Sequence, residues 1–267
     1  MIRFYLENLK RVFKIKTIVC ILIIPFFIML DTDDNFLNML LNRRDYSGMD
    51  MVYYIFGMLQ WGLYHGLVLL VAVIPFACEI SREWKEGFSH QVIQRIGVKR
   101  YTGMHIAISG ISGGITVMSG FWLYVGILSL RLPVFLNNGI NAESFVEGAY
   151  GTWLMGEPWK YLLAISVCWF FVGVASAVAA VAASGVCFNR YIIIIVPYVI
   201  WNIYIEAAKI FHIPNHLRLD WILMGKIQIG KGMTGVWSVA LIMTIIAFSC
   251  WIFCYKKMKE RMQSGGV

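Results

Sequence analysis

Charged residues along the chain are separated by six long apolar stretches. A helix that crosses a bilayer core of about 30 Å needs roughly 20 apolar residues. Four uncharged runs reach that length, and the two short ones, at 17–30 and 191–205, are completed by apolar neighbours. The pattern therefore predicts six membrane-spanning helices, at about 13–30, 51–77, 102–130, 161–185, 191–211 and 233–255.

The composition narrows the class of protein. Of the 267 residues, 59% are hydrophobic and only 14% are charged, against about 25% charged in an average soluble domain. An ordinary soluble enzyme is excluded. No soluble domain or low-complexity linker interrupts the apolar runs, so residues 1–267 are predicted to form a single all-α transmembrane domain.

The first 15 residues carry a helical pattern of their own. Apolar side chains recur every three or four positions, from Ile2 to Phe13, with charged residues opposite. This amphipathic pattern predicts an interfacial helix over 1–15, lying in the membrane surface before the first span. A straight extension of the first span is the alternative.

Basic residues are distributed unequally between the two sides of the predicted bundle. Fifteen of the 23 Lys and Arg residues fall on the side of the N-terminus, and ten of the 15 acidic residues fall on the other side. The positive-inside rule then places both termini in the cytoplasm. Contact with anionic lipid accounts for the net charge of +8, so no nucleic acid partner is expected.

Three sequence features could have indicated enzymatic chemistry, and each is incomplete. The segment Gly225–Lys231 has GxxxxGK spacing, but Gly232 stands where a phosphate loop needs Ser or Thr. His212 and His216 flank Pro214 and lack the Glu of a metalloprotease helix. The six cysteines lie in or at the ends of spans without zinc or disulfide spacing. We expect no catalytic residue, no metal and no cofactor in this chain.

The loop after the second span has the most informative pattern. Ser81 can cap a helix, and Trp84, Phe88, Val92 and Ile96 recur at about every fourth position. This spacing predicts an amphipathic helix over about 81–96, ending at Gly97. Such a helix suits docking on a partner, and packing on lipid is the alternative.

The same loop resembles the first inner loop of permease subunits of ABC-2 type ABC transporters. The resemblance lies in the order Glu79, Arg82-Glu83, Glu86-Gly87, a short helix, and then Arg100-Tyr101 before a long span. The six-span layout, inner termini and short second inner loop are similar too. Phe88 and Gly97 stand where the family commonly has Thr and Pro, departures that concern the subfamily and its cargo more than the architecture.

The resemblance implies a transport subunit rather than an enzyme. In that family the loop is a cytoplasmic coupling helix seated in a separate ATPase subunit, present in two copies, which binds ATP and Mg²⁺. The chain would form half of an export pathway in a bacterial cell membrane, beside an identical or homologous second half. Cargo in the family includes antimicrobial peptides and lipid-like molecules. The implied ATPase contacts are Arg82, Glu83, Trp84, Glu86, Gly87 and Phe88.

An ATP-independent intramembrane enzyme or channel with six similar helices is the alternative function. Polar and aromatic residues within the spans are candidates for the pathway, because such groups are costly in a membrane. For His65 an interhelical hydrogen bond is an alternative role, and for Glu206 and Lys209 a structural ion pair is the alternative. The candidates are Gln60, Trp61, His65, Glu206 and Lys209.

Small residues in the second and third spans predict close helix packing. Gly62 and Gly66 form one GxxxG pair, and Gly110 and Gly114 form another. Such pairs let two backbones approach closely. Packing within one subunit is favoured over a seam between two subunits.

Overall fold

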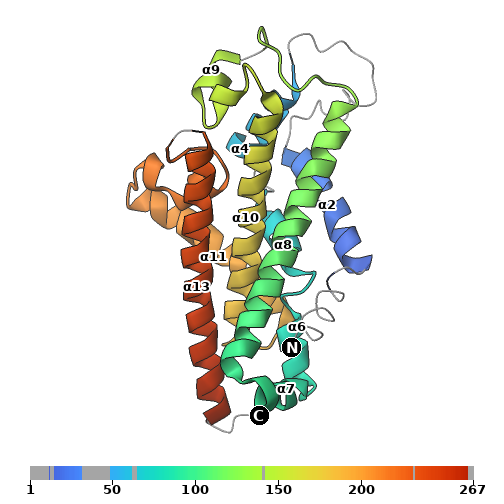
Figure 1. Cartoon of the computed structure of the whole chain (residues 1–267), viewed down its shortest axis with the longest axis vertical. Coiled ribbons are helices and arrows are strands. Elements are labelled where there is room, and N and C mark those ends of the chain that lie inside the picture. The colour runs from blue at the N-terminus through green and yellow to red at the C-terminus, as the bar shows by residue number, and fades with distance from the viewer. Residues whose placement is uncertain are drawn as a thin grey trace.

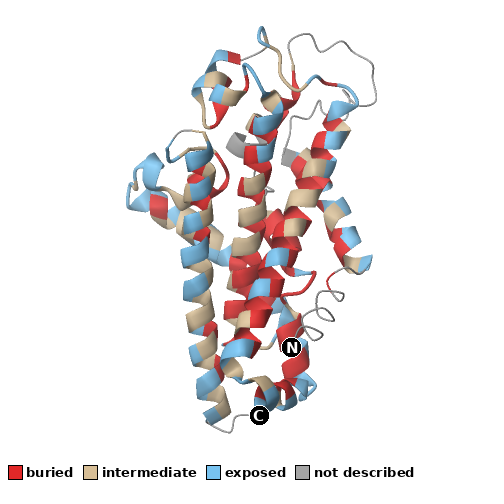
Figure 2. Ribbon diagram, viewed as in Figure 1, coloured by how far each residue is buried: buried red, intermediate tan, exposed pale blue. Residues whose placement is uncertain are grey.

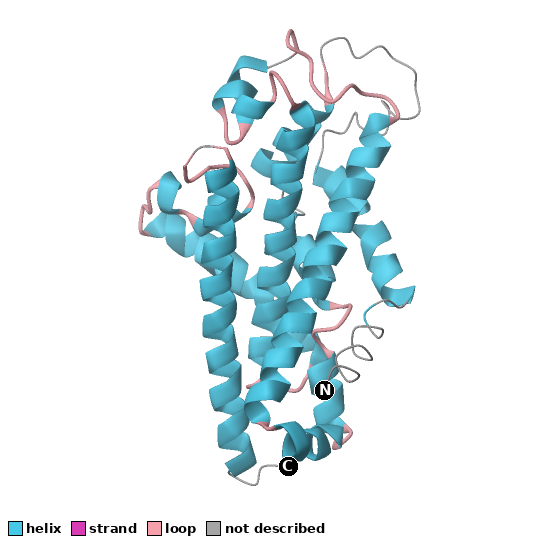
Figure 3. Cartoon of the chain, viewed as in Figure 1, coloured by secondary structure: helices cyan, strands magenta, loops and turns pink. Residues whose placement is uncertain are grey.

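The computed structural model describes residues 12, 15–31, 49–61, 65–139, 142–230 and 232–263, although the side chains of 31, 57–61 and 65 are outside this description. The predicted interfacial helix over 1–15 lies almost entirely outside the described residues. Gly62 also lies outside them. All regular secondary structure in the described ranges is helical (Figure 3).

Four helices are long and apolar enough to cross a membrane. They are α8 (Val98–Ser129), α10 (Pro158–Ser184), α11 (Arg190–Ile210) and α13 (Met233–Gln263). The chain therefore has the character of an all-α, multi-pass membrane protein. These helices agree with the last four predicted spans, although α13 continues to Gln263 because the charged residues after 255 are good helix formers.

The first two predicted spans are not confirmed. The helix α2 (Ile15–Asp31) has only 17 residues and contains Pro25. Within the predicted span 51–77 the structure describes α4 (Met51–Trp61) and α5 (His65–Val73), and residues 62–64 lie outside the described residues. The helix α5 ends two residues before Pro75, where a proline removes a backbone donor and disfavours helical geometry in the preceding residue.

The helices α8 and α10 form the centre of the bundle. The helix α13 packs along both of them (Figure 1). The helix α5 also contacts both, and α2 contacts α8. In the most apolar stretches of α8 and α10, 56% and 61% of the residues are buried, against 17% and 11% in α11 and α13. Figure 2 shows this contrast between the central pair and α13.

Short elements cover the two ends of the bundle. We call one end the α6–α7 end, after α6 (Glu79–Lys85) and α7 (Phe88–Ile96). The opposite end is the α9 end (Figure 1). Besides its loops, the α9 end consists of α9 (Ala142–Glu147) and η1 (Gly151–Trp153). In the sequence, η2 (Asn215–Leu217) and α12 (Leu219–Leu223) lie between α11 and α13.

The predicted packing glycines lie in contacts within the chain. A Cβ on Gly114 of α8 would lie 2.5 Å from the ring of Phe170, and one on Gly110 would lie 3.3 Å from Val178; both partners belong to α10. On α5, a Cβ on Gly66 would lie 2.9 Å from the ring of Tyr198 in α11. Close packing of this kind matters in a membrane, where lipid is as apolar as the helices.

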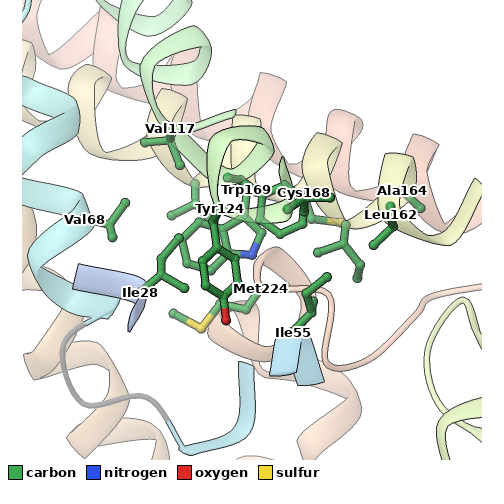
Figure 4. Close-up of a cluster of buried hydrophobic side chains, with 14 of the residues drawn as sticks. Ile28, Ile55, Val68, Val117, Tyr124, Leu162, Ala164, Cys168, Trp169 and Met224 are labelled. Atoms are coloured by element: carbon green, nitrogen blue, oxygen red, sulfur yellow. The ribbon is translucent and has the colours of Figure 1, made fainter. Parts of the chain in front are cut away.

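Large buried side chains connect the central pair to the shorter helices. Trp169 of α10 stacks on Phe121 of α8, with ring centroids 6.3 Å apart. Ile28 from α2, Ile55 from α4 and Met224 from the loop after α12 surround the same cluster (Figure 4). The α9 end is thus anchored to the bundle core by the residues that follow α12.

Candidate functional site

The predicted coupling segment consists of two helices rather than one. The helix α6 ends at Lys85, and α7 begins at Phe88 and ends at Ile96, before Gly97 as predicted. Gly87 between them has φ +71°, a left-handed conformation that glycine adopts without a steric penalty. We call residues 79–96 the α6–α7 hairpin.

A buried carboxylate holds α6 against α8. The Tyr101 hydroxyl donates a hydrogen bond of 3.0 Å to Glu83 Oε2, and His105 Nε2 lies 3.2 Å from the same oxygen. The side chains of Glu83 and His105 are 2% and 1% exposed. Phe76 stacks on the imidazole at 5.6 Å. We call Phe76, Glu83, Tyr101 and His105 the Glu83 cluster.

The geometry of the Glu83 cluster determines its chemistry. An ionised carboxylate at Glu83 would only accept hydrogen bonds, and Nε2 of His105 would then be the donor that faces it. Hydrogen bonds to a charged group are strong, and a buried charge without partners is costly. Glu83 therefore fixes α6 to α8 as long as both donors remain in place.

A second contact connects the hairpin to the α10–α11 loop and to α13. Trp84 stacks on Phe188, in the loop between α10 and α11, with centroids 4.9 Å apart. The Arg261 guanidinium of α13 lies 4.3 Å from the Phe188 ring and donates a hydrogen bond to the Val186 carbonyl. The Ser81 hydroxyl donates to the Phe188 carbonyl. Phe188 thus joins α6, the α10–α11 loop and α13.

A chain of ion pairs extends from the bundle to the hairpin surface. Lys16 of α2 lies 2.9 Å from Glu79, which also pairs with Arg82 at 2.5 Å. Arg82 lies 3.7 Å from Glu86. Glu79 is nearly buried, whereas Arg82 and Glu86 are 50% and 61% exposed at their side chains. The hairpin therefore has an internal side and an exposed face.

The six residues predicted to contact an ATPase divide between these two sides. Arg82, Glu86, Gly87 and Phe88 are exposed. Glu83 and Trp84 are 2% and 8% exposed and face the chain's own helices, so their side chains do not form part of the exposed face. The helical period indicated an amphipathic segment, but it could not tell which side packs on the bundle.

Among the predicted pathway residues, the structure describes the side chains of Glu206 and Lys209. The side chains of Gln60, Trp61 and His65 lie outside the described residues. Glu206 and Lys209 form an ion pair of 2.6 Å on the surface of α11. Their side chains are 64% and 55% exposed, a geometry that agrees with the structural-pair alternative.

The described residues contain no cluster that could hold a metal ion. Within these ranges, no three His, Cys, Asp or Glu side chains lie close enough to hold a metal ion, and the six cysteines are free thiols. The described part of the GxxxxGK segment, residues 225–230, is a loop between α12 and α13, and no strand precedes it in the described residues. A phosphate loop needs such a strand and a helix directly after it.

Sequence reasoning missed Tyr101, His105 and Phe188 as partners of the hairpin. The spacing of Tyr101 and His105, four residues apart, places them on one face of a helix and was a usable signal. Nothing local to Phe188 indicated that Trp84 and Arg261, far away in the sequence, meet there.

Comparisons with protein families, with curated proteins and with solved structures found no match to this chain.

Proposed function

We propose that this chain is the transmembrane subunit of an ABC-2 type exporter, which forms half of a translocation pathway and couples to a separate ATPase subunit. The α6–α7 hairpin carries the proposal. Its outer face is exposed and charged, while Glu83 and Trp84 fix its inner side to α8 and to the Phe188 contact. A force on the outer face would pass into the long helices through these two contacts.

The ATPase docks on the exposed hairpin residues Arg82, Glu86, Gly87 and Phe88. Phe88 is an aromatic side chain, 38% exposed, with charged neighbours. A central aromatic anchor with a polar rim is typical of protein–protein interfaces. The partner binds ATP and Mg²⁺, and its closure moves the hairpin together with α8.

The distribution of basic residues supports a cytoplasmic location for this end of the bundle. Lys99 and Arg100 at the start of α8, Arg190 at the start of α11 and Lys256 near the end of α13 are all exposed. The positive-inside rule favours the cytoplasm for such residues. The chain then lies in a bacterial cell membrane with its hairpin accessible to a soluble ATPase.

Two such halves, identical or homologous, complete the exporter with two ATPase copies. The outer faces of α11 and α13 expose large apolar side chains to lipid or to the second half. The cargo is amphipathic, such as an antimicrobial peptide or a lipid-like molecule. The 40 aromatic residues and 14 Met of the chain are compatible with such cargo.

Copurification with the ATPase tests the proposal. The chain is expressed with the products of its neighbouring genes and purified in nanodiscs, and the bound ATPase is quantified by its hydrolysis of ATP. Wild-type protein should retain a soluble chain with a complete phosphate loop. Glu86→Lys should lower its retention several-fold, because a reversed charge in the interface meets complementary groups of the wrong sign.

Glu260→Lys is the matched control for Glu86→Lys. Both carboxylates are 61% exposed, and both pair with a basic residue on their own helix or next to it. Each substitution changes the net charge equally, so only a specific contact distinguishes them. Purification without any nucleotide-hydrolysing partner, or equal retention in both variants, would contradict the proposal.

A further inference from the structure

A small cavity lies at the α9 end, where α4, α9, α10 and the loop after α12 meet. The residues that line it include Phe56, Phe145, Tyr161 and Lys226. The space inside is about 20 Å³, and about 310 Å³ of space without protein atoms surrounds it, open solvent at the mouth included. One water-sized polar group fits inside, and an attached chain would leave through the mouth.

The backbone places Lys226 at this cavity through a constrained turn. Gly225 has φ +75°, and a Cβ on it would lie 2.8 Å from the Ile165 side chain of α10. The Lys226 amide donates a hydrogen bond of 2.8 Å to the Trp221 carbonyl. Only glycine adopts this φ angle and leaves room for Ile165 without strain. The turn therefore fixes the backbone position of Lys226.

The loop around Lys226 is held on its far side as well. The Tyr150 amide donates to Gln228 Oε1 at 2.8 Å, and Gln228 Nε2 donates to the Gly232 carbonyl at 3.0 Å. These bonds tie the loop before α13 to the segment after α9. Hydrogen bonds therefore hold this loop both at the Lys226 amide and at the Gln228 side chain.

Lys226 lacks an anionic partner among the described residues. The carboxylate of Asp220, nearby in sequence, is already bound by Arg218 through two hydrogen bonds of 3.2 and 2.6 Å. The Lys226 amine lies 5.9 Å from the centre of the Trp221 ring. Burial lowers the pKa of Lys226. A partly desolvated cation of this kind gains most from an anion that binds from outside the chain.

Tyr161 is a second lining residue that carries a hydrogen-bond donor. Its side chain is 3% exposed, and its hydroxyl makes no hydrogen bond with the residues that the structure describes. An amine and a hydroxyl in one cavity suit a group with several acceptor oxygens better than a single-atom ligand.

We propose that this cavity binds an oxyanion, a phosphate or a carboxylate, with the Lys226 amine as its main partner and Tyr161 as a second donor. Either ligand, a free ion or an amphiphile, would place one oxygen inside the cavity and its remaining atoms at the mouth, where the amphiphile would lay its apolar chain along Phe56 and Phe145. The oxyanion chemistry is common to both sources. This inference is independent of the transport function proposed above.

Titration of the purified full chain in a non-ionic detergent tests this site. The probes are dodecyl phosphate, inorganic phosphate and zwitterionic dodecylphosphocholine, with binding measured by calorimetry in the same buffer. We expect Lys226→Gln to weaken binding of dodecyl phosphate about tenfold or more, the usual effect of losing a charge-assisted hydrogen bond. Dodecylphosphocholine should bind more weakly than dodecyl phosphate, because its head has no net charge.

Lys160→Gln is the matched control, because Lys160 is 59% exposed and pairs with Glu157 at the start of α10. It removes the same charge and should leave binding within about twofold. Tyr161→Phe keeps the ring and should weaken binding by a smaller factor than Lys226→Gln. Melting temperatures of all variants show whether the fold is retained.

The two phosphate probes distinguish the sources of the oxyanion. Inorganic phosphate that binds with the same dependence on Lys226 identifies a free ion as sufficient, and binding of dodecyl phosphate alone identifies an amphiphile. Equal binding of dodecyl phosphate by Lys226→Gln and Lys160→Gln overturns the proposal. Absence of binding by both phosphate probes to the wild-type chain overturns it as well.

Discussion

Glu83 and Lys226 are ionisable groups at opposite ends of the bundle, and both are withdrawn from solvent. Glu83 accepts a hydrogen bond from Tyr101 and lies within hydrogen-bonding distance of His105. Lys226 has no ionic partner within the described residues. The Glu83 carboxylate is therefore paired within the fold, whereas the Lys226 amine is available to bind an anion from outside the chain.

This difference separates a mechanical role from a binding role. A buried charge with protein partners fixes two elements to each other, because moving either one exposes an uncompensated group. A partly buried amine without an ionic partner does not hold elements together. Its burial also disfavours the protonated form and so lowers its pKa. The Glu83 cluster therefore suits transmission of movement, and the Lys226 cavity suits a ligand.

Removal of the carboxylate at Glu83 should have the largest effect. Glu83→Ala leaves the Tyr101 hydroxyl and a His105 nitrogen buried without their acceptor, and we expect a loss of about 3 kcal/mol in the free energy of unfolding. Denaturation in detergent, followed by tryptophan fluorescence, measures it. Glu86→Ala, at a 61% exposed side chain, should change stability by less than about 0.5 kcal/mol. Equal losses in the two variants would show that the cluster does not hold α6.

Substitution of the glycine beside Lys226 should have the next largest effect. Gly225→Ala forces a non-glycine residue into φ +75° and against Ile165, at a cost of about 2 kcal/mol. The same denaturation measures this cost. Gly126→Ala is the control, because a Cβ there meets nothing within 4 Å and alanine favours the helix. A neutral Gly225→Ala would mean that the turn is not constrained.

The hydroxyl of Tyr101 should contribute about 1 kcal/mol. Tyr101→Phe removes one donor to Glu83 and keeps the ring that packs on His105. In the Glu83→Ala background the same change should cost much less, since its partner is already absent. A double-mutant cycle from four unfolding curves gives this coupling, and additive effects would refute the shared bond.

The unpaired amine of Lys226 should give the smallest effect, with a dependence on pH. Because the pKa of Lys226 is lowered in the folded chain, the unfolded chain binds the proton more tightly. Stability should therefore rise with pH from the lowered folded value up to the unfolded value of about 10.4. Lys226→Met lacks this group, so its stability should exceed that of the wild type by a few tenths of a kcal/mol near neutral pH, and the gap should close as pH rises. A constant gap across this window would contradict the assignment.

The long helices were predictable because their cause is local. Apolar runs of sufficient length located α8, α10 and α13 to within a few residues, apart from the extended end of α13, and the short run at 191–205 with its apolar neighbours located α11. The predicted span 51–77 was not confirmed: helix is described at 51–61 and 65–73, and the chain turns around Pro75 before the predicted end of the span. Length and hydropathy do not register such an interruption.

The candidate site was only partly predictable, because its contacts are long-range. The sequence predicted one amphipathic helix over about 81–96 and its end at Gly97, but the turn at Gly87 was not predicted, and burial of Glu83 and Trp84 depends on Tyr101, His105 and Phe188. Lys226 was noticed only within an incomplete phosphate-loop pattern. Its cavity depends on how α4, α9 and α10 meet, which no local pattern encodes.

The most direct test of the proposed coupling separates binding of the ATPase from transmission of its movement. Met155 near the α9 end is 65% exposed, and Met155→Cys gives a labelling site for a membrane-impermeant maleimide. In the complex with the ATPase, trapping with ATP and vanadate should change the labelling rate of this cysteine several-fold. The complex carrying Glu83→Gln should still bind and hydrolyse ATP, but its labelling rate should no longer respond. An unaltered response in Glu83→Gln would contradict the claim that Glu83 transmits movement from the hairpin to the bundle.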